Sequence, residues 1–286
     1  MKGAAALKKE NKKASDKYPL RICLYDDYGE DFDGGDFTEK KIDKSYKYVH
    51  KNIFYRIWAK ALYRLIFTPV GLIYSKFVLK EKFYGKEKMK KYRGRGRFVY
   101  ANHTQAVADA FSPHVLTIPE RAYTVISSKN FKLPVLGRLL PALGGLPLPT
   151  ELSAARNFSA AVKCRIGEGR TVVIFPEGHL WPYCTFLRPF SPGSFDYPVR
   201  LDCPAFTMTR VYVKRGRGVG SDVYIDGPFF PDGSLPPKEA REKLSREIRE
   251  AMEARLELTE LEVVRYERRD KTPAFASAEA SDGAEG

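Results

Sequence analysis

The residue pair with the clearest potential for acid–base chemistry is a histidine followed by a nearby aspartate. His103 and Asp109 lie in the sequence NHTQAVAD, residues 102–109. A carboxylate that binds one ring nitrogen orients the imidazole and leaves the other nitrogen free to take a proton from a hydroxyl. The pair therefore indicates a general base, although a histidine close to an aspartate in sequence is more often structural than catalytic.

A second candidate block is FPEGH, residues 175–179, which follows the apolar run Thr171 to Ile174. Proline and glycine on either side of Glu177 favour a sharp turn that would present the carboxylate at the end of a strand. A plain strand-ending turn explains this block equally well when it is taken alone.

Together the two blocks resemble those of glycerolipid acyltransferases of the 1-acylglycerol-3-phosphate acyltransferase (PlsC-like) type, whose signatures are NHxxxxD and FPEG. The order and separation of the blocks agree with that family, and the resemblance covers roughly residues 98–227. Weaker matches are GGLPLP at 144–149 and DCPA at 202–205, which occupy the places of the second and fourth family blocks.

The resemblance implies an O-acyltransferase that moves a fatty acyl group from acyl-CoA or acyl-carrier protein to a hydroxyl of lysophosphatidic acid, giving phosphatidic acid. His103 would be the general base and Asp109 would orient it. The implied substrate-binding residues are Asn102, Thr104, Glu177 and Gly178. The resemblance implies no metal or cofactor.

Three departures from the family pattern bear on these roles. Five residues separate His103 from Asp109 where the family has four, so the turn must absorb one residue. Thr150 stands where the second block has a phosphate-binding arginine, and His179 follows FPEG where Thr-Arg or Ser-Arg is usual. Arg156 and Arg188 are the nearest arginines that could bind the acceptor phosphate bidentately, and ordinary surface positions are the alternative for both.

The residue pattern after residue 97 predicts a β-sheet, which would position these motifs. Five short runs are rich in β-branched and aromatic residues, and a helix-like segment at 154–167 lies between two of them. The runs are 98–101, 123–126, 171–175, 205–213 and 222–225. Alternating strands and helices predict an α/β domain with a mixed sheet flanked by helices, and motifs at strand ends suit that fold.

A membrane-associating helical segment is expected before this domain. Residues 53–79 are apolar and aromatic but carry four cations, and Pro69 would break or kink a helix. This pattern favours a kinked helix or helix pair lying in the membrane interface, with an ordinary core helix as the alternative. Nine lysines and arginines between 80 and 97 add attraction to an anionic leaflet.

The expected organisation is a disordered basic arm and acidic linker (1–45), the membrane-associating segment (46–96), the acyltransferase domain (97–235), an amphipathic helix (236–268) and a disordered tail (269–286). No secretory signal is evident, and the four cysteines show no CxxC spacing. Both observations favour a peripheral or monotopic protein on the cytoplasmic face of a membrane.

Three other functions fit parts of the sequence. The same chemistry could act on another lysolipid or a glycolipid, because the phosphate-binding arginines are missing. A catalytically inactive membrane-binding homologue would follow if the extra residue breaks the dyad. A net charge of +14 also suits nucleic acid, but no recognised nucleic-acid-binding motif is present, so we expect no such partner.

Overall fold

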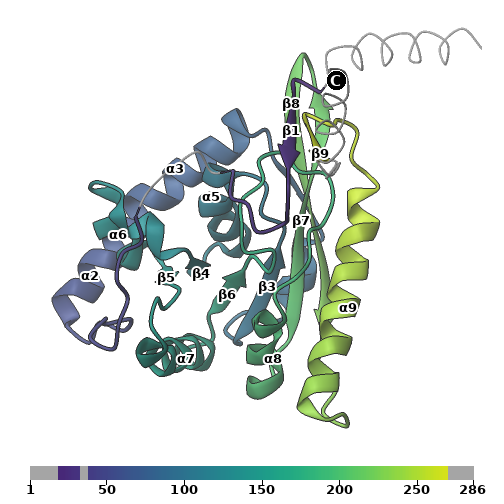
Figure 1. Cartoon of the computed structure of the whole chain (residues 1–286). Helices are drawn as coiled ribbons and strands as arrows, with labels where there is room; N and C mark the ends of the chain where they lie inside the picture. The colour runs from purple at the N-terminus through teal and green to yellow at the C-terminus, as the bar shows by residue number, and fades with distance from the viewer. Residues whose placement is uncertain (1–18, 33–37, 270–286) are drawn as a thin grey trace, which may run out of the picture.

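The computed structural model describes residues 19–32 and 38–269, and its centre is a seven-stranded mixed sheet with helices on both faces (Figure 1). The strand order is β2-β8-β7-β3-β6-β4-β5. The predicted α/β class is therefore confirmed. The strands of this sheet are β2 Lys82–Tyr84, β3 Arg97–Ala101, β4 Ala122–Ile126, β5 Gly145–Pro147, β6 Thr171–Ile174, β7 Ala205–Arg215 and β8 Gly218–Phe229. The α-helices are α2 Ile53–Leu62, α3 Thr68–Ile73, α4 Lys86–Lys90, α5 Ala106–Thr117, α6 Leu136–Leu143, α7 Leu152–Gly167, α8 Asp196–Leu201 and α9 Pro237–Leu256.

Strand β3 lies in the middle of the sheet and is parallel to both neighbours, β6 and β7. Tyr100 pairs with Ile174 near the end of both strands. Because parallel strands end at the same edge, the two motif blocks that follow β3 and β6 come together there.

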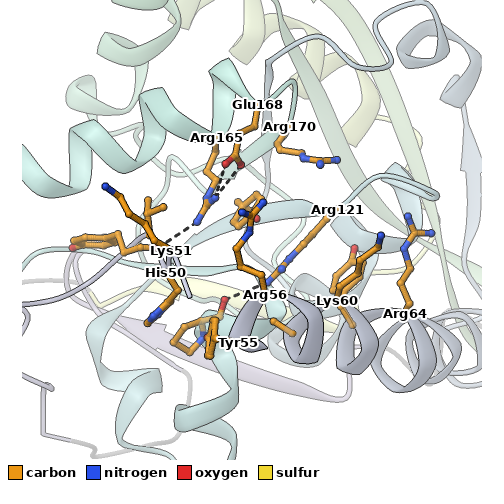
Figure 2. A pocket seen from close by; sticks show the side chains of 16 residues that line it. His50, Lys51, Tyr55, Arg56, Lys60, Arg64, Arg121, Arg165, Glu168 and Arg170 are labelled. Carbon is orange, nitrogen blue, oxygen red and sulfur yellow. Dashed lines mark hydrogen bonds and ion pairs between the residues drawn. The ribbon is translucent and has the colours of Figure 1, made fainter. Parts of the chain in front are cut away.

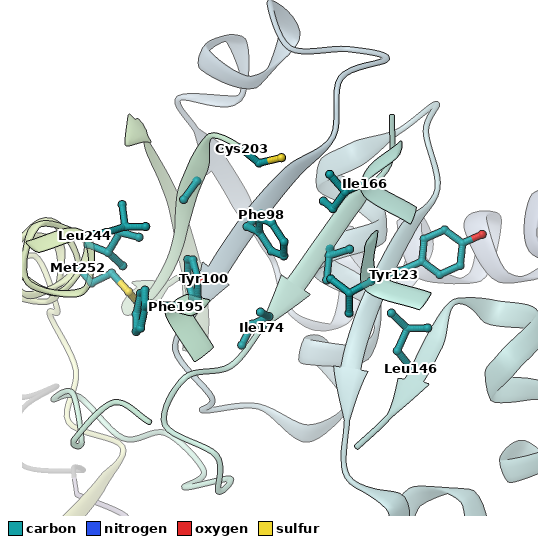
Figure 3. Packing of buried hydrophobic residues seen from close by; sticks show 14 of the residues in the cluster. Phe98, Tyr100, Tyr123, Leu146, Ile166, Ile174, Phe195, Cys203, Leu244 and Met252 are labelled. Carbon is teal, nitrogen blue, oxygen red and sulfur yellow. The ribbon is translucent and has the colours of Figure 1, made fainter. Parts of the chain in front are cut away.

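The side chains of β3 alternate between two cores. Phe98 and Tyr100 pack in a cluster with residues of α7 and α9 (Figure 3), whereas Val99 and Ala101 pack in a second cluster on the other face. A strand buried on both faces reads as a continuous apolar run, which explains why these short runs were recognisable in the sequence.

The apolar segment forms one continuous helical course over Ile53–Val78, not two helices. Two π-helical segments, Tyr63–Phe67 and Tyr74–Val78, alternate with α2 and α3. The first π segment precedes Pro69. There the Thr68 N–H donates to the carbonyl of Tyr63, five residues earlier, instead of the carbonyl of Arg64, four residues earlier, that an α-helix would use. By length and composition this 26-residue helix could cross a membrane.

The buried face of this helix is made of Ala59, Tyr63, Gly71 and Ser75. Small side chains let it approach α5 closely, since a Cβ added at Gly71 would lie 3.0 Å from the Phe111 ring. The opposite face is apolar and open to solvent: Phe54 is 79% exposed and Leu65 is 75% exposed.

The predicted organisation needs correction at both ends. Within the expected disordered region 1–45, strand β1 (Arg21–Tyr25) pairs in parallel with β9 (Val264–Arg268) in a separate two-stranded sheet. The C-terminal segment is accordingly helix α9 followed by a strand, not helix to residue 268. The pairing joins segments about 240 residues apart in sequence, which no local pattern reveals. Residues 1–18, 33–37 and 270–286 of the expected arm, linker and tail lie outside the described residues.

The basic run from 80 to 97 is also less uniform than a membrane-contacting patch. Arg97 is buried, where its guanidinium pairs with Glu120 and donates to the Tyr92 carbonyl at 2.7 Å. Lys88 pairs with Asp226 at 2.8 Å. These two cations serve the fold, because a buried or paired charge is not free to meet lipid phosphates.

Candidate active site

The centre of the candidate site is the pair His103 and Asp109. Nδ1 of His103 lies 2.8 Å from Oδ2 of Asp109, and the Asp109 side chain is almost fully buried. Because an ionised carboxylate only accepts hydrogen bonds, Nδ1 carries the proton and Nε2 is the basic nitrogen. The His103 side chain is 23% exposed, so a substrate hydroxyl can reach the ring.

The turn between these residues absorbs the extra residue noted in the sequence. Gln105 caps α5 in an extended conformation, and its backbone N–H donates to Asp109 Oδ2 at 3.0 Å. The same oxygen thus holds both the cap residue and the imidazole. The five-residue spacing is compatible with a formed dyad.

A buried cation, Arg210, lies beside the Asp109 carboxylate. Arg210, on β7, lies 3.9 Å from Asp109 Oδ1 and forms an ion pair of 2.5 Å with Glu81. Burial lowers the pKa of Arg210, but the charges of Glu81 and Asp109 more than offset this effect and raise it. Ser112 joins the network by donating to Glu81 at 2.6 Å and accepting from Arg210 at 2.8 Å. Asp109 therefore faces a fixed positive charge.

The second motif block holds the backbone of the first. Oε1 of Glu177 accepts from the His103 backbone N–H at 3.0 Å, and Oε2 binds Arg188 Nε at 2.8 Å. Both side chains of the Glu177–Arg188 pair are fully buried. Phe175, from the same block, stacks on the His103 ring with centroids 4.5 Å apart.

This burial corrects two expected roles. Neither the Glu177 nor the Arg188 side chain is open to solvent, so neither is placed to bind an acceptor, and Arg188 is not a surface residue. The two charges compensate one another, which is how buried ionic groups are tolerated. The pair contacts the backbone N–H and carbonyl of His103.

Asn102 and Thr104 are likewise buried. The Asn102 amide accepts from the Arg210 N–H at 2.8 Å and donates to the Arg210 carbonyl at 2.9 Å. The Thr104 hydroxyl accepts a hydrogen bond from the Tyr212 hydroxyl at 2.8 Å. These contacts tie the loop to β7, so the two buried side chains hold the loop.

The remaining predicted residues are Gly178 and Arg156. Gly178 adopts a positive φ of 79°, and no atom lies near the place a Cβ would occupy, so its contribution is the turn itself. Arg156 is exposed on α7, and no hydrogen bond or ion pair joins it to the dyad among the described residues.

Two nitrogen-bearing side chains near this edge were not assigned a binding role by sequence reasoning. Lys129 follows β4, and His179 follows the FPEG block; they lie 3.9 and 3.8 Å from the carboxylate of Asp31. Both are partly exposed. The available signal in the sequence was their position, because each follows a strand whose C-terminal end lies at the same edge of the sheet as the dyad. Among the described residues no group of histidines, cysteines and carboxylates is arranged to hold a metal ion.

Comparison with known proteins agrees with the motif analysis. Residues 80–211 match the family model described as Acyltransferase, and the chain thus carries an acyltransferase domain. This confirms the predicted enzyme class and the family resemblance.

Among solved structures, the crystal structure of the 1-acyl-sn-glycerophosphate (LPA) acyltransferase PlsC from Thermotoga maritima is similar, with 19% identity and a TM-score of 0.45. The similarity covers 70% of this chain and 93% of that one. Curated protein sequences give no match.

Proposed function

We propose that this acyltransferase moves a fatty acyl group from a thioester, acyl-CoA or acyl-carrier protein, to a hydroxyl of lysophosphatidic acid, forming phosphatidic acid. The observation that carries the proposal is the 2.8 Å contact between His103 and Asp109 at the sheet edge. It supports a base that is oriented, accessible and suited to activating a hydroxyl.

In the proposed reaction, Nε2 of His103 takes the proton of the acceptor hydroxyl as that oxygen bonds to the thioester carbonyl carbon. The C–S bond then breaks, and the imidazolium returns the proton to the departing thiolate, giving a thiol and an ester. Asp109 stabilises the imidazolium between these steps. Proton transfer of this kind contributes about 10²–10⁴-fold, and holding both substrates together supplies much of the remainder.

For the acceptor phosphate we propose Lys129 and His179. They take the place of the arginines that the family pattern leads one to expect, and their partial exposure leaves them accessible. Asp31 beside them reduces the positive charge, which favours a second candidate: the same chemistry on a lysolipid with a less anionic headgroup.

We also propose that the exposed apolar face of the Ile53–Val78 helix binds the membrane from the cytoplasmic side, as a peripheral or monotopic attachment. One face of the helix packs on the domain, so a lipid-facing position parallel to the membrane surface fits better than a free span.

The test uses full-length protein in mixed micelles with an acyl-CoA and lysophosphatidic acid, following thiol release and the lipid product by mass spectrometry. Phosphatidic acid formation that is lost in His103→Ala, with an unchanged unfolding temperature, is the expected result. Thiol release that ignores the acceptor would point to a thioesterase. Absence of turnover with acyl-CoA, acyl-carrier protein and a panel of lysolipids would leave the inactive membrane-binding homologue.

A further inference from the structure

A strongly basic cavity lies at the end of the sheet where strands β4 and β6 begin, opposite the end that carries the dyad. It has a volume of about 510 Å³ and is lined by seven lysines and arginines but by a single carboxylate, Glu168 (Figure 2). Arg121 and Arg170 enter it from the residues just before β4 and β6, where those strands begin. The dyad lies beyond the far ends of β3 and β6. With a rise of about 3.3 Å per residue, the strands separate the two places by roughly 13 Å or more.

The outer wall of the cavity is the first half of the apolar helix. Arg56, Lys60 and Arg64 line it, and their spacing of four residues places them on one helix face. The neighbouring face of the same helix carries Phe54 and Ile57, which are 79% and 60% exposed. A cationic cavity therefore opens directly beside an apolar surface suited to lipid.

The inner wall holds two arginines close together. Arg121 and Arg165 both lie over the ring of Tyr123, at 5.0 and 4.4 Å from its centroid. Arg165 pairs with Glu168 at 2.9 Å, and it is the cavity's one cation with a carboxylate partner among residues 19–32 and 38–269. The Nε atoms of Arg121 and Arg165 are buried and have no hydrogen-bond partner in the part of the chain that the structure describes.

The cavity is also electropositive enough to affect its own side chains. Burial lowers the pKa of Arg121, and the charge of Arg165 lowers it further. The pKa of His50 is lowered in the same way, by burial and then by the charges of Arg165 and Lys47. Uncompensated like charges in a partly enclosed space repel, and an anion bound among them would remove that cost.

We propose that this cavity is a binding site for the phosphate-bearing headgroup of an anionic membrane lipid, separate from the site of acyl transfer. Among the described residues, the guanidinium groups of Arg56, Arg64 and Arg170 make no side-chain hydrogen bond or ion pair. They suit phosphate oxygens, which arginine binds through paired hydrogen bonds. The excess of six positive charges favours a headgroup with a phosphomonoester in addition to the phosphodiester. The adjacent apolar face favours a lipid as the source of the phosphate, because the acyl chains of that lipid would lie against Phe54 and Ile57.

The site would hold the enzyme in one orientation on the membrane. The helix that lines the cavity continues to Ser75, whose hydroxyl donates to Glu81, the carboxylate that pairs with Arg210 below the dyad. A headgroup bound at the start of the helix thereby places the dyad at a set position along the same lipid surface. Binding at this site does not require the acyl transfer chemistry to be as proposed.

The test compares vesicle binding by two double variants of the full chain. Arg56→Gln with Lys60→Gln removes two exposed cations from the cavity, and Lys76→Gln with Lys82→Gln removes two cations near the far end of the same helix. Vesicles contain phosphatidylcholine with either phosphatidylinositol monophosphate or phosphatidylserine, at matched total charge. Binding is measured by co-sedimentation, and thermal unfolding verifies that each variant is folded.

The expected result is that the wild type prefers the phosphomonoester vesicles and that the cavity variant binds them about tenfold more weakly, with a much smaller loss in the control variant. Equal losses in the two variants, or equal binding to both vesicle types, would overturn the site, because diffuse attraction depends only on charge. Pyrophosphate that binds the protein as tightly as the lipid does, without membranes, would overturn the assignment to a lipid. None of these outcomes depends on whether acyl transfer is observed.

Discussion

The backbone N–H of His103 donates to Oε1 of Glu177 at 3.0 Å and so joins two motif blocks that are 74 residues apart. The other oxygen of Glu177 binds Arg188, which also contacts the His103 carbonyl at 3.4 Å. The backbone of the candidate base is therefore held on both sides by one buried ion pair.

This relationship predicts a large effect of Glu177→Gln on stability. The substitution leaves the fully buried Arg188 without its counter-charge, and breaking a buried pair in this way costs about 3–5 kcal/mol. Urea denaturation would measure the loss. The double variant Glu177→Gln with Arg188→Met should recover part of it, and a double variant no more stable than the single one would contradict this account.

Asp109→Asn should separate the role of Asp109 in orienting His103 from its role in folding. The amide is nearly the same size but cannot stabilise an imidazolium, so we expect kcat to fall by about 10²–10⁴-fold. The measurement is thiol release with saturating acyl-CoA and acceptor. Asp43→Asn, at a surface turn where the carboxylate binds Ser45, is the matched control and should keep wild-type activity.

Stability should decrease in acid because of His114. This ring is buried against Tyr63, whose hydroxyl lies 3.0 Å from Nδ1. Burial, followed by the charge of Arg121, lowers the pKa of His114 from its ordinary 6.5 to about 3. Between these values the unfolded chain binds a proton that the folded chain does not. The free energy of unfolding should therefore fall by up to about 1.4 kcal/mol per pH unit below pH 6.5.

Urea denaturation between pH 7 and pH 4.5 checks this dependence. His114→Asn keeps an acceptor for the Tyr63 hydroxyl and removes the titration, so its curve should be flatter than that of the wild type. An unchanged slope in this variant would assign the acid sensitivity to other groups.

Membrane attachment should depend on the exposed face of the Ile53–Val78 helix. Replacing Phe54 and Ile57 by serine removes two exposed apolar side chains, and each is worth about 1.5–3 kcal/mol when fully buried, so partitioning into neutral vesicles should fall at least about tenfold. Leu258→Ser, at an exposed position after α9, is the control. Wild-type partitioning of the Phe54 and Ile57 variant would show that this face does not enter lipid.

Local sequence alone determined five of the seven strands of the central sheet, the apolar helical segment and the two motif blocks; the short strands β2 and β5 were not predicted. Strands buried on both faces, such as β3 and β6, appear as short continuous apolar runs because each residue faces one core or the other. The sequence also indicated that His103 and Glu177 belong to one site, because both follow such runs and strand ends gather at one edge of an α/β sheet.

Tertiary structure alone decided which charges meet. Arg188 resembled any surface arginine in the sequence, yet the fold buries it against Glu177, and the geometry of one turn accommodates the extra residue before Asp109. The β1–β9 pairing and the basic cavity likewise bring together residues that are distant in sequence. Local patterns record which face of an element is apolar, whereas the pairing of polar groups depends on positions in space that only the folded chain defines.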